Sequence, residues 1–148
     1  MAEIGFYHLL STPLERALPR LLERAVGQGH RVVVLAGSPE RVEQLNALLW
    51  TYDEAGFLAH GSTRDGNAAA QPIWLTHQPE NPNGASVLFL VDGSEADDLT
   101  GFARCVDMFD GSDPEAVAAA RGRWRAGTAA GHTLTYWQQT DRGWDKKA

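Results

Sequence analysis

Two kinds of hydrophobic pattern alternate along this chain, and together they predict an α/β fold. Continuous apolar, β-branched runs at 31–36 and 86–91 are typical of strands buried on both faces of a parallel sheet. Apolar residues recur at helical spacing at 14–26 and 42–49. This alternation favours a single α/β domain over residues 1–148, with a mainly parallel sheet and helices on both faces.

The individual elements follow from the same pattern. Strands are expected at 4–10, 31–36, 73–75, 86–91, 105–110 and 132–139, and helices at 12–27, 38–50, 97–104 and 113–129. Thr12 and Glu15 have the spacing of a capping box, with Pro13 at the first helical position. Pro19 is expected to kink the first helix or to mark a restart. The segment 51–71 is expected to be a long loop, and a basic tail follows residue 141.

Charge and cysteine content restrict the possible partners. The net charge of −6 and the pI of about 5.3 argue against a general affinity for nucleic acid, which we expect the protein to reach only indirectly. The single cysteine, Cys105, lies in an apolar run and is expected to be a buried thiol. Residues 1–5 show no basic start to a signal peptide, and no apolar run is long enough to cross a membrane. We therefore expect a cytoplasmic protein with no membrane partner.

Sequence motifs for catalysis or cofactor binding are lacking. Phosphate-binding loops need glycines before a helix, but residues 10–13 contain none and only Gly37 follows the second strand. Neither G-x-G-x-x-G nor a Walker lysine occurs, and no two histidines share a helix face at i, i+4. We expect no cofactor and no metal. The alternative is a nucleotide- or phosphate-dependent enzyme on a Rossmann-like sheet.

One candidate interaction surface surrounds Trp50. Several large side chains cluster in sequence near glycine-punctuated chain: Trp50, Tyr52, Phe57, Leu58 and His60. They could pack over the edge of the sheet. They could also anchor a protein partner, because aromatic residues carry much of the binding energy at interfaces.

The second candidate surface lies on the last predicted helix. Residues 90–115 hold eight acidic residues and one basic residue, whereas residues 121–148 hold six basic and two acidic ones. Arg121 and Arg125 share a face at i, i+4, and Trp124 adjoins that face. Two guanidinium groups beside an aromatic ring could bind a carboxylate and an apolar side chain together. The alternative is a solvated helix face with Trp124 half-buried.

The chain also resembles a known family, the chi subunit of bacterial DNA polymerase III holoenzyme. The similarity covers nearly the whole chain, and its motifs are individually short but ordered and spaced as in the family. Ala59 stands where the family often has proline. The matching motifs are Phe6-Tyr7-His8-Leu9, Leu49-Trp50, Phe57-Leu58-Ala59-His60-Gly61, Gln71-Pro72-Ile73, Asn83, Val91-Asp92-Gly93, Phe109-Asp110-Gly111, Ala120-Arg121, Trp124 and Gly131 with Leu134-Thr135-Tyr136-Trp137.

The resemblance implies a non-catalytic adaptor of the clamp-loader assembly with a Rossmann-like fold and no nucleotide. Chi-like proteins bind the acidic C-terminal tail of single-stranded-DNA-binding protein, which ends in an aromatic residue and a free carboxylate. They also bind the psi subunit. By correspondence, Arg121, Trp124 and Arg125 would bind the tail, and the surface around Trp50 and Phe57, with Leu58 and His60, would face psi or another clamp-loader component.

Overall fold

The seven strands of the described residues form one sheet, and all but one of its strand pairs are parallel. The computed structural model describes residues 2–52, 58–96 and 98–148. The strands are β1 (Glu3–Leu9), β2 (Val32–Leu35), β3 (Ile73–Thr76), β4 (Val87–Leu90), β5 (Arg104–Asp110), β6 (Thr133–Thr140) and β7 (Gly143–Lys146). They lie in the order β3-β2-β4-β5-β1-β6-β7. Only β6 and β7 are antiparallel, so the predicted α/β class with a mainly parallel sheet is confirmed.

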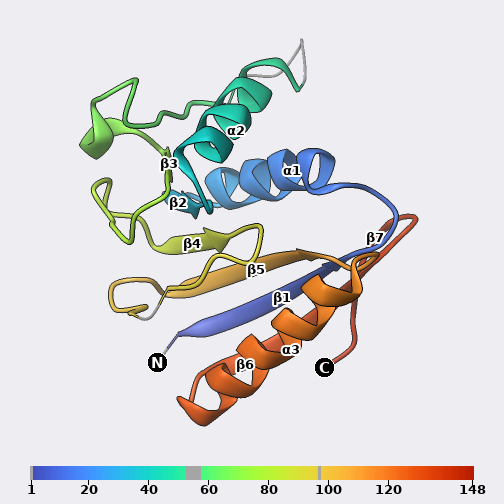
Figure 1. The fold of residues 1–148 in the computed structure, drawn as a ribbon. Helices are drawn as coiled ribbons and strands as arrows, with labels where there is room; N and C mark the ends of the chain where they lie inside the picture. The colour runs from blue at the N-terminus through green and yellow to red at the C-terminus, as the bar shows by residue number, and fades with distance from the viewer. Residues whose placement is uncertain (1, 53–57, 97) are drawn as a thin grey trace.

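Helices cover both faces of the sheet (Figure 1). The α-helices of the described residues are α1 (Leu14–Gly27), α2 (Pro39–Thr51) and α3 (Pro114–Ala129). Alternate strand residues point to opposite faces, so the sheet separates two hydrophobic clusters. Leu18 and Leu45 pack in the cluster beneath α1 and α2, whereas Ala120 and Trp124 belong to the cluster beneath α3.

The C-terminal segment forms a strand where we expected a basic tail. β7 runs antiparallel to β6, pairing Gln139 with Trp144. The Trp144 ring packs edge-on against Tyr7, with ring centroids 4.9 Å apart. Trp144 is the single large apolar residue of β7, so the hydrophobic pattern was too short to predict the strand.

Two smaller expectations were wrong, and for Pro19 the restart is excluded while a kink stays a prediction. Pro13 is the N-cap of α1 and no side chain caps the helix, because the Thr12 hydroxyl instead accepts a hydrogen bond from Gln139. α1 is a single helix with Pro19 buried inside it, so no restart occurs there. Residues 98–103 form turns, a bend and irregular chain and no helix, and Arg104 begins β5. The loop 51–71 holds a short 3₁₀ helix (Ala68–Ala70).

Cys105 is fully buried in β5, as expected, and burial raises the pKa of its thiol. None of the helices in the described part of the chain is long and apolar enough to span a membrane.

Candidate functional site

A cavity of about 390 Å³ lies between α3 and the sheet, and it brings the three predicted tail-binding residues together. Arg121, Trp124 and Arg125 all line it. Arg121 and Arg125 are exposed at its rim, and Trp124 is half-buried. The remaining lining residues are mostly apolar and are Phe6, Phe109, Val117, Ala120, Tyr136 and Ala148.

Aromatic rings build the interior of this cavity. The Trp124 ring packs edge-on against Phe6, with centroids 5.4 Å apart, and against Tyr136, with centroids 6.1 Å apart. Phe6 of β1 and Tyr136 of β6 are register partners on neighbouring strands, so they project side by side toward α3. Trp124 is thus held from below and forms a firm apolar wall next to the two arginines.

The guanidinium groups at the rim are available to an anion. Within residues 2–52, 58–96 and 98–148, no carboxylate lies within ion-pair distance of Arg121 or Arg125. The intervening Arg123 is different, because its side chain is 10% exposed and pairs with the buried carboxylate of Asp107 at 2.6 Å. α3 therefore presents two arginines outward and uses one to fasten itself to β5.

His8 is hydrogen-bonded to one of the aromatic residues that line the cavity. The Tyr136 hydroxyl shares a hydrogen bond with His8 Nδ1. Burial lowers the pKa of His8, and the nearby Arg121 acts in the same direction. Burial also raises the pKa of Tyr136, so both groups are neutral at neutral pH. Gly111 leaves room for this arrangement, since a Cβ there would lie 2.0 Å from the His8 ring.

Phe6, Phe109 and Tyr136 line this cavity but were not predicted as site residues. Strand periodicity was the available signal. Phe6 pairs with Tyr136 across β1 and β6, and Phe109 stands at the end of the neighbouring β5. Choosing the face that meets α3 requires the strand order, which the hydrophobic pattern does not contain.

The residues predicted around Trp50 divide between the surface and the core. Trp50 is 54% exposed, whereas Leu58 and His60 are only 5% and 4% exposed. The His60 ring lies under the indole of Trp50, with centroids 4.6 Å apart, and its nitrogens bond the carbonyl oxygens of Leu58 and Asn46. His60 therefore supports Trp50 from beneath, whereas Leu58 packs in the hydrophobic core. Phe57 lies outside the described residues.

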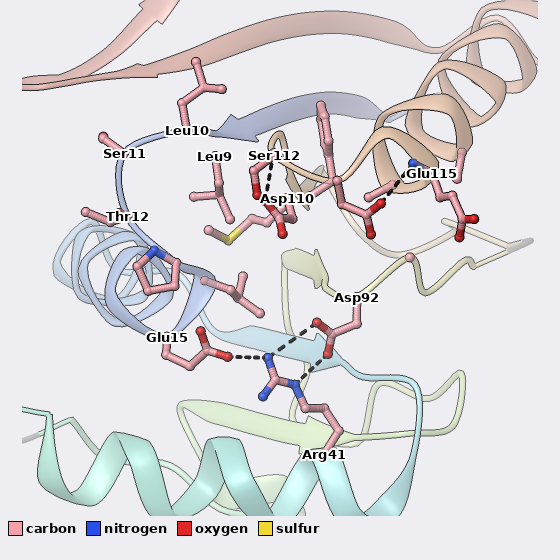
Figure 2. Close-up of a pocket in the computed structure, with 18 of the residues that line it drawn as sticks. Leu9, Leu10, Ser11, Thr12, Glu15, Arg41, Asp92, Asp110, Ser112 and Glu115 are labelled. Atoms are coloured by element: carbon pink, nitrogen blue, oxygen red, sulfur yellow. Dashed lines mark hydrogen bonds and ion pairs between the residues drawn. The ribbon is translucent and has the colours of Figure 1, made fainter.

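A larger cavity, of about 710 Å³, lies where β1 and β5 end (Figure 2). The chain leaves β1 toward α1 on one face and leaves β5 toward α3 on the other. Such a divergence of adjacent strands is where α/β sheets usually bind nucleotides. Here, however, the walls carry five carboxylates: Glu15, Asp92, Asp110, Asp113 and Glu115.

The chain's own charges occupy the positions that a phosphate would need. Figure 2 shows Arg41 between Glu15 and Asp92, with ion-pair distances of 2.9 and 2.7 Å. Asp113 caps α3 by accepting a hydrogen bond from the Glu115 backbone N–H. Arg41 holds the pKa of Glu15 below its usual range, so this carboxylate stays charged at the start of α1. An incoming phosphate would meet negative charge at both helix N-termini.

Comparison with known proteins identifies the family. The family model described as "DNA polymerase III chi subunit, HolC" matches residues 1–135. A curated relative from Rickettsia prowazekii (strain Madrid E), the "Probable DNA polymerase III subunit chi", is 35% identical over 95 residues. That match covers 64% of this chain and 58% of the relative's length. The chain belongs to the DNA polymerase III chi subunit family.

Proposed function

We propose that this chain is a non-catalytic accessory subunit that links the clamp-loader assembly of DNA polymerase III to single-stranded-DNA-binding protein, by binding the acidic C-terminal tail of that protein. Its Rossmann-like sheet serves as a scaffold for protein interactions. The observation that carries the proposal is the cavity beside α3, where two outward-facing guanidinium groups border an aromatic slot.

The chemistry of the tail suits this cavity. Carboxylates of the tail pair with Arg121 and Arg125 at the rim, since guanidinium groups bind carboxylates with two parallel hydrogen bonds. The terminal aromatic ring enters the slot beside Trp124, which edge-on contacts with Phe6 and Tyr136 hold in place. A flexible tail loses conformational entropy on binding, so we expect a micromolar affinity, about 8 kcal/mol. Several tails on one DNA-bound oligomer raise the effective affinity by avidity.

A second surface, centred on Trp50, binds the psi subunit or another clamp-loader component in this proposal. An indole that is 54% exposed and rests on a buried histidine is a rigid anchor for a partner. His60 contributes by fixing the position of this ring rather than by contact with the partner, and Leu58 is a buried core residue.

The acidic cavity of Figure 2 does not favour the alternative, a nucleotide-dependent enzyme. Its carboxylates repel phosphate, and they satisfy the helix N-termini that would otherwise bind it. A thermal-shift screen distinguishes the two functions. We expect no shift with nucleotides and a clear shift with an acidic, phenylalanine-ended peptide; the reverse pattern would support the enzyme.

The binding of intact single-stranded-DNA-binding protein tests the proposal. The full-length partner should bind this chain, and a version without its last tail residues should not. Equal binding of both versions would place the contact outside the cavity beside α3.

A further inference from the structure

A third cavity, on the face of the sheet opposite to the cavity beside α3, has the composition of a binding site. It encloses about 600 Å³ between the second half of α1 and the strands β1, β6 and β7. We call it the arginine groove. The arginine, tyrosine and tryptophan residues that line it are Tyr7, Arg24, Arg104, Trp137, Arg142 and Trp144. Phe6 and Tyr7 are neighbours on β1 and point to opposite faces, so this groove is distinct from the cavity that Phe6 lines.

The floor of the groove is an aromatic platform on the sheet. Tyr7 and Trp137 are register partners on β1 and β6, and their rings stack at 6.1 Å with planes 12° apart. The Trp144 ring of β7 meets Tyr7 edge-on. α1 packs over β2 and β5, so this end of the sheet keeps half-exposed indoles on its surface.

The walls of the groove are positively charged, although the whole chain is acidic. Three arginines and one carboxylate, Glu3, line it. In the described parts of the chain, none of the three arginines has a carboxylate within ion-pair distance. Arg104 donates to the Tyr7 hydroxyl at 3.1 Å, while its buried Nε has no hydrogen-bond partner among the described residues. The groove therefore places three arginines, against one carboxylate, next to a cluster of aromatic rings.

We propose that the arginine groove binds a short stretch of single-stranded nucleic acid directly, with bases stacked on Trp144 and Trp137 and phosphates against Arg24, Arg104 and Arg142. Single strands are commonly bound by aromatic side chains on an open sheet with cations beside them, because every base has a face that can stack. A carboxylate-rich peptide would satisfy the arginines, but it would leave most of the aromatic platform uncovered. Duplex DNA keeps its bases stacked inside and cannot use the platform.

Direct binding in the groove differs from the expectation, drawn from the sequence, that this protein reaches nucleic acid only through a partner. That expectation rested on the net charge of −6, which is an average over the whole chain. The acidic remainder weakens long-range attraction, so we expect weak binding that depends strongly on salt. Three phosphate contacts would give a slope of about −2 for log affinity against log salt concentration.

Fluorescence anisotropy with a labelled oligothymidylate of about 8 nucleotides tests the proposal at low salt. Arg24→Ala and Arg142→Ala should each weaken binding by about fivefold and reduce the salt slope by about 0.7. Trp144→Ala should weaken it by about tenfold, and Trp144→Phe should retain most of the affinity because it keeps a stacking ring. Arg20→Ala is the matched control, since Arg20 is exposed on the same helix outside the groove.

The variant Arg121→Ala separates this proposal from the proposed function. It should lose binding of the acidic peptide and keep binding of the oligonucleotide. The inference is overturned if the oligonucleotide does not bind, if it binds equally to the Arg24→Ala, Arg142→Ala and Arg20→Ala proteins, or if a duplex of the same length binds as well. It is also overturned if the groove variants lose only the acidic peptide, which would make the groove a protein site.

Discussion

Arg123 and Asp107 form a buried ion pair that fastens α3 to the sheet. Arg123 Nε donates to one carboxylate oxygen of Asp107 at 2.6 Å, and Nη2 donates to the other at 3.0 Å. Arg121 and Arg125 lie two residues to either side of Arg123, so they leave the helix on a different side from Arg123 and are exposed at the rim of the cavity beside α3. One arginine on α3 is thus internal, while its two neighbours remain at the rim of the cavity.

Arg123→Ala should destabilise the fold. Burial raises the pKa of Asp107, and the hydrogen bonds from Arg123 oppose that shift. Removing Arg123 leaves the carboxylate buried without its partner, at a cost of about 3–5 kcal/mol in the free energy of unfolding. Urea denaturation measures this cost. Arg121→Ala is the control and should change stability by less than about 0.5 kcal/mol; equal losses would show that Arg121 is also structural.

The Arg123–Asp107 ion pair illustrates which features could be predicted from the sequence and which could not. Apolar runs located β2 and β4, and helical spacing located α1 and α2, because each signal is local. Cys105, Asp107 and Phe109 occupy every second position of β5, so all three face α3. Nothing local shows that Arg123, rather than a neighbouring arginine, reaches that carboxylate.

Of the cavity beside α3, the part whose residues are close together in sequence was predicted. Arg121, Trp124 and Arg125 occupy successive turns of one helix, so spacing alone placed them together. The other walls come from β1, β5 and β6, which only the sheet order brings under α3. For the surface around Trp50, apolar composition could not distinguish the exposed indole from the buried Leu58 and His60.

The pKa of His8 should report occupancy of the cavity beside α3. Arg121 helps to lower this pKa in the free protein. Carboxylates bound at Arg121 would offset its charge, so the pKa of His8 should rise when an acidic peptide is added, and also in Arg121→Ala. Binding then takes up protons, and affinity should increase as the pH falls below about 6.5. An NMR titration of the His8 ring in the free, peptide-bound and Arg121→Ala proteins measures this.

The low pKa of His8 also affects stability. The folded value lies below the unfolded one, so the unfolded chain binds the proton more readily. His8 should therefore reduce the free energy of unfolding as the pH falls below about 6.5.

A His8 resonance that titrates identically in the free, peptide-bound and Arg121→Ala proteins would contradict the electrostatic coupling between His8 and Arg121.

Trp50→Ala should separate partner binding from folding. The indole is 54% exposed, so we expect a stability change of less than about 1 kcal/mol by thermal unfolding. Binding of the proposed clamp-loader partner should weaken by about 2 kcal/mol or more, as for a central aromatic anchor. Leu10→Ala is the matched control, since Leu10 is 48% exposed at the acidic cavity. Equal partner affinity for both variants would remove Trp50 from the interface.

Cys105 should be inert in the folded protein. Its side chain is fully buried, and burial raises the pKa of the thiol, so the reactive thiolate is suppressed. A thiol reagent at neutral pH should modify it only after unfolding in denaturant. Modification of the native protein at the rate of a free thiol would reveal an opening of the sheet near β5.

Calorimetry with an acidic peptide ending in phenylalanine tests the central claim, that the cavity beside α3 receives the anionic end of another polypeptide. The wild-type protein should bind with micromolar affinity, and added salt should weaken the binding. Arg125→Ala should reduce the binding free energy by about 2 kcal/mol or more while the domain stays folded. Unchanged affinity in a folded Arg125→Ala protein would contradict the proposed pocket.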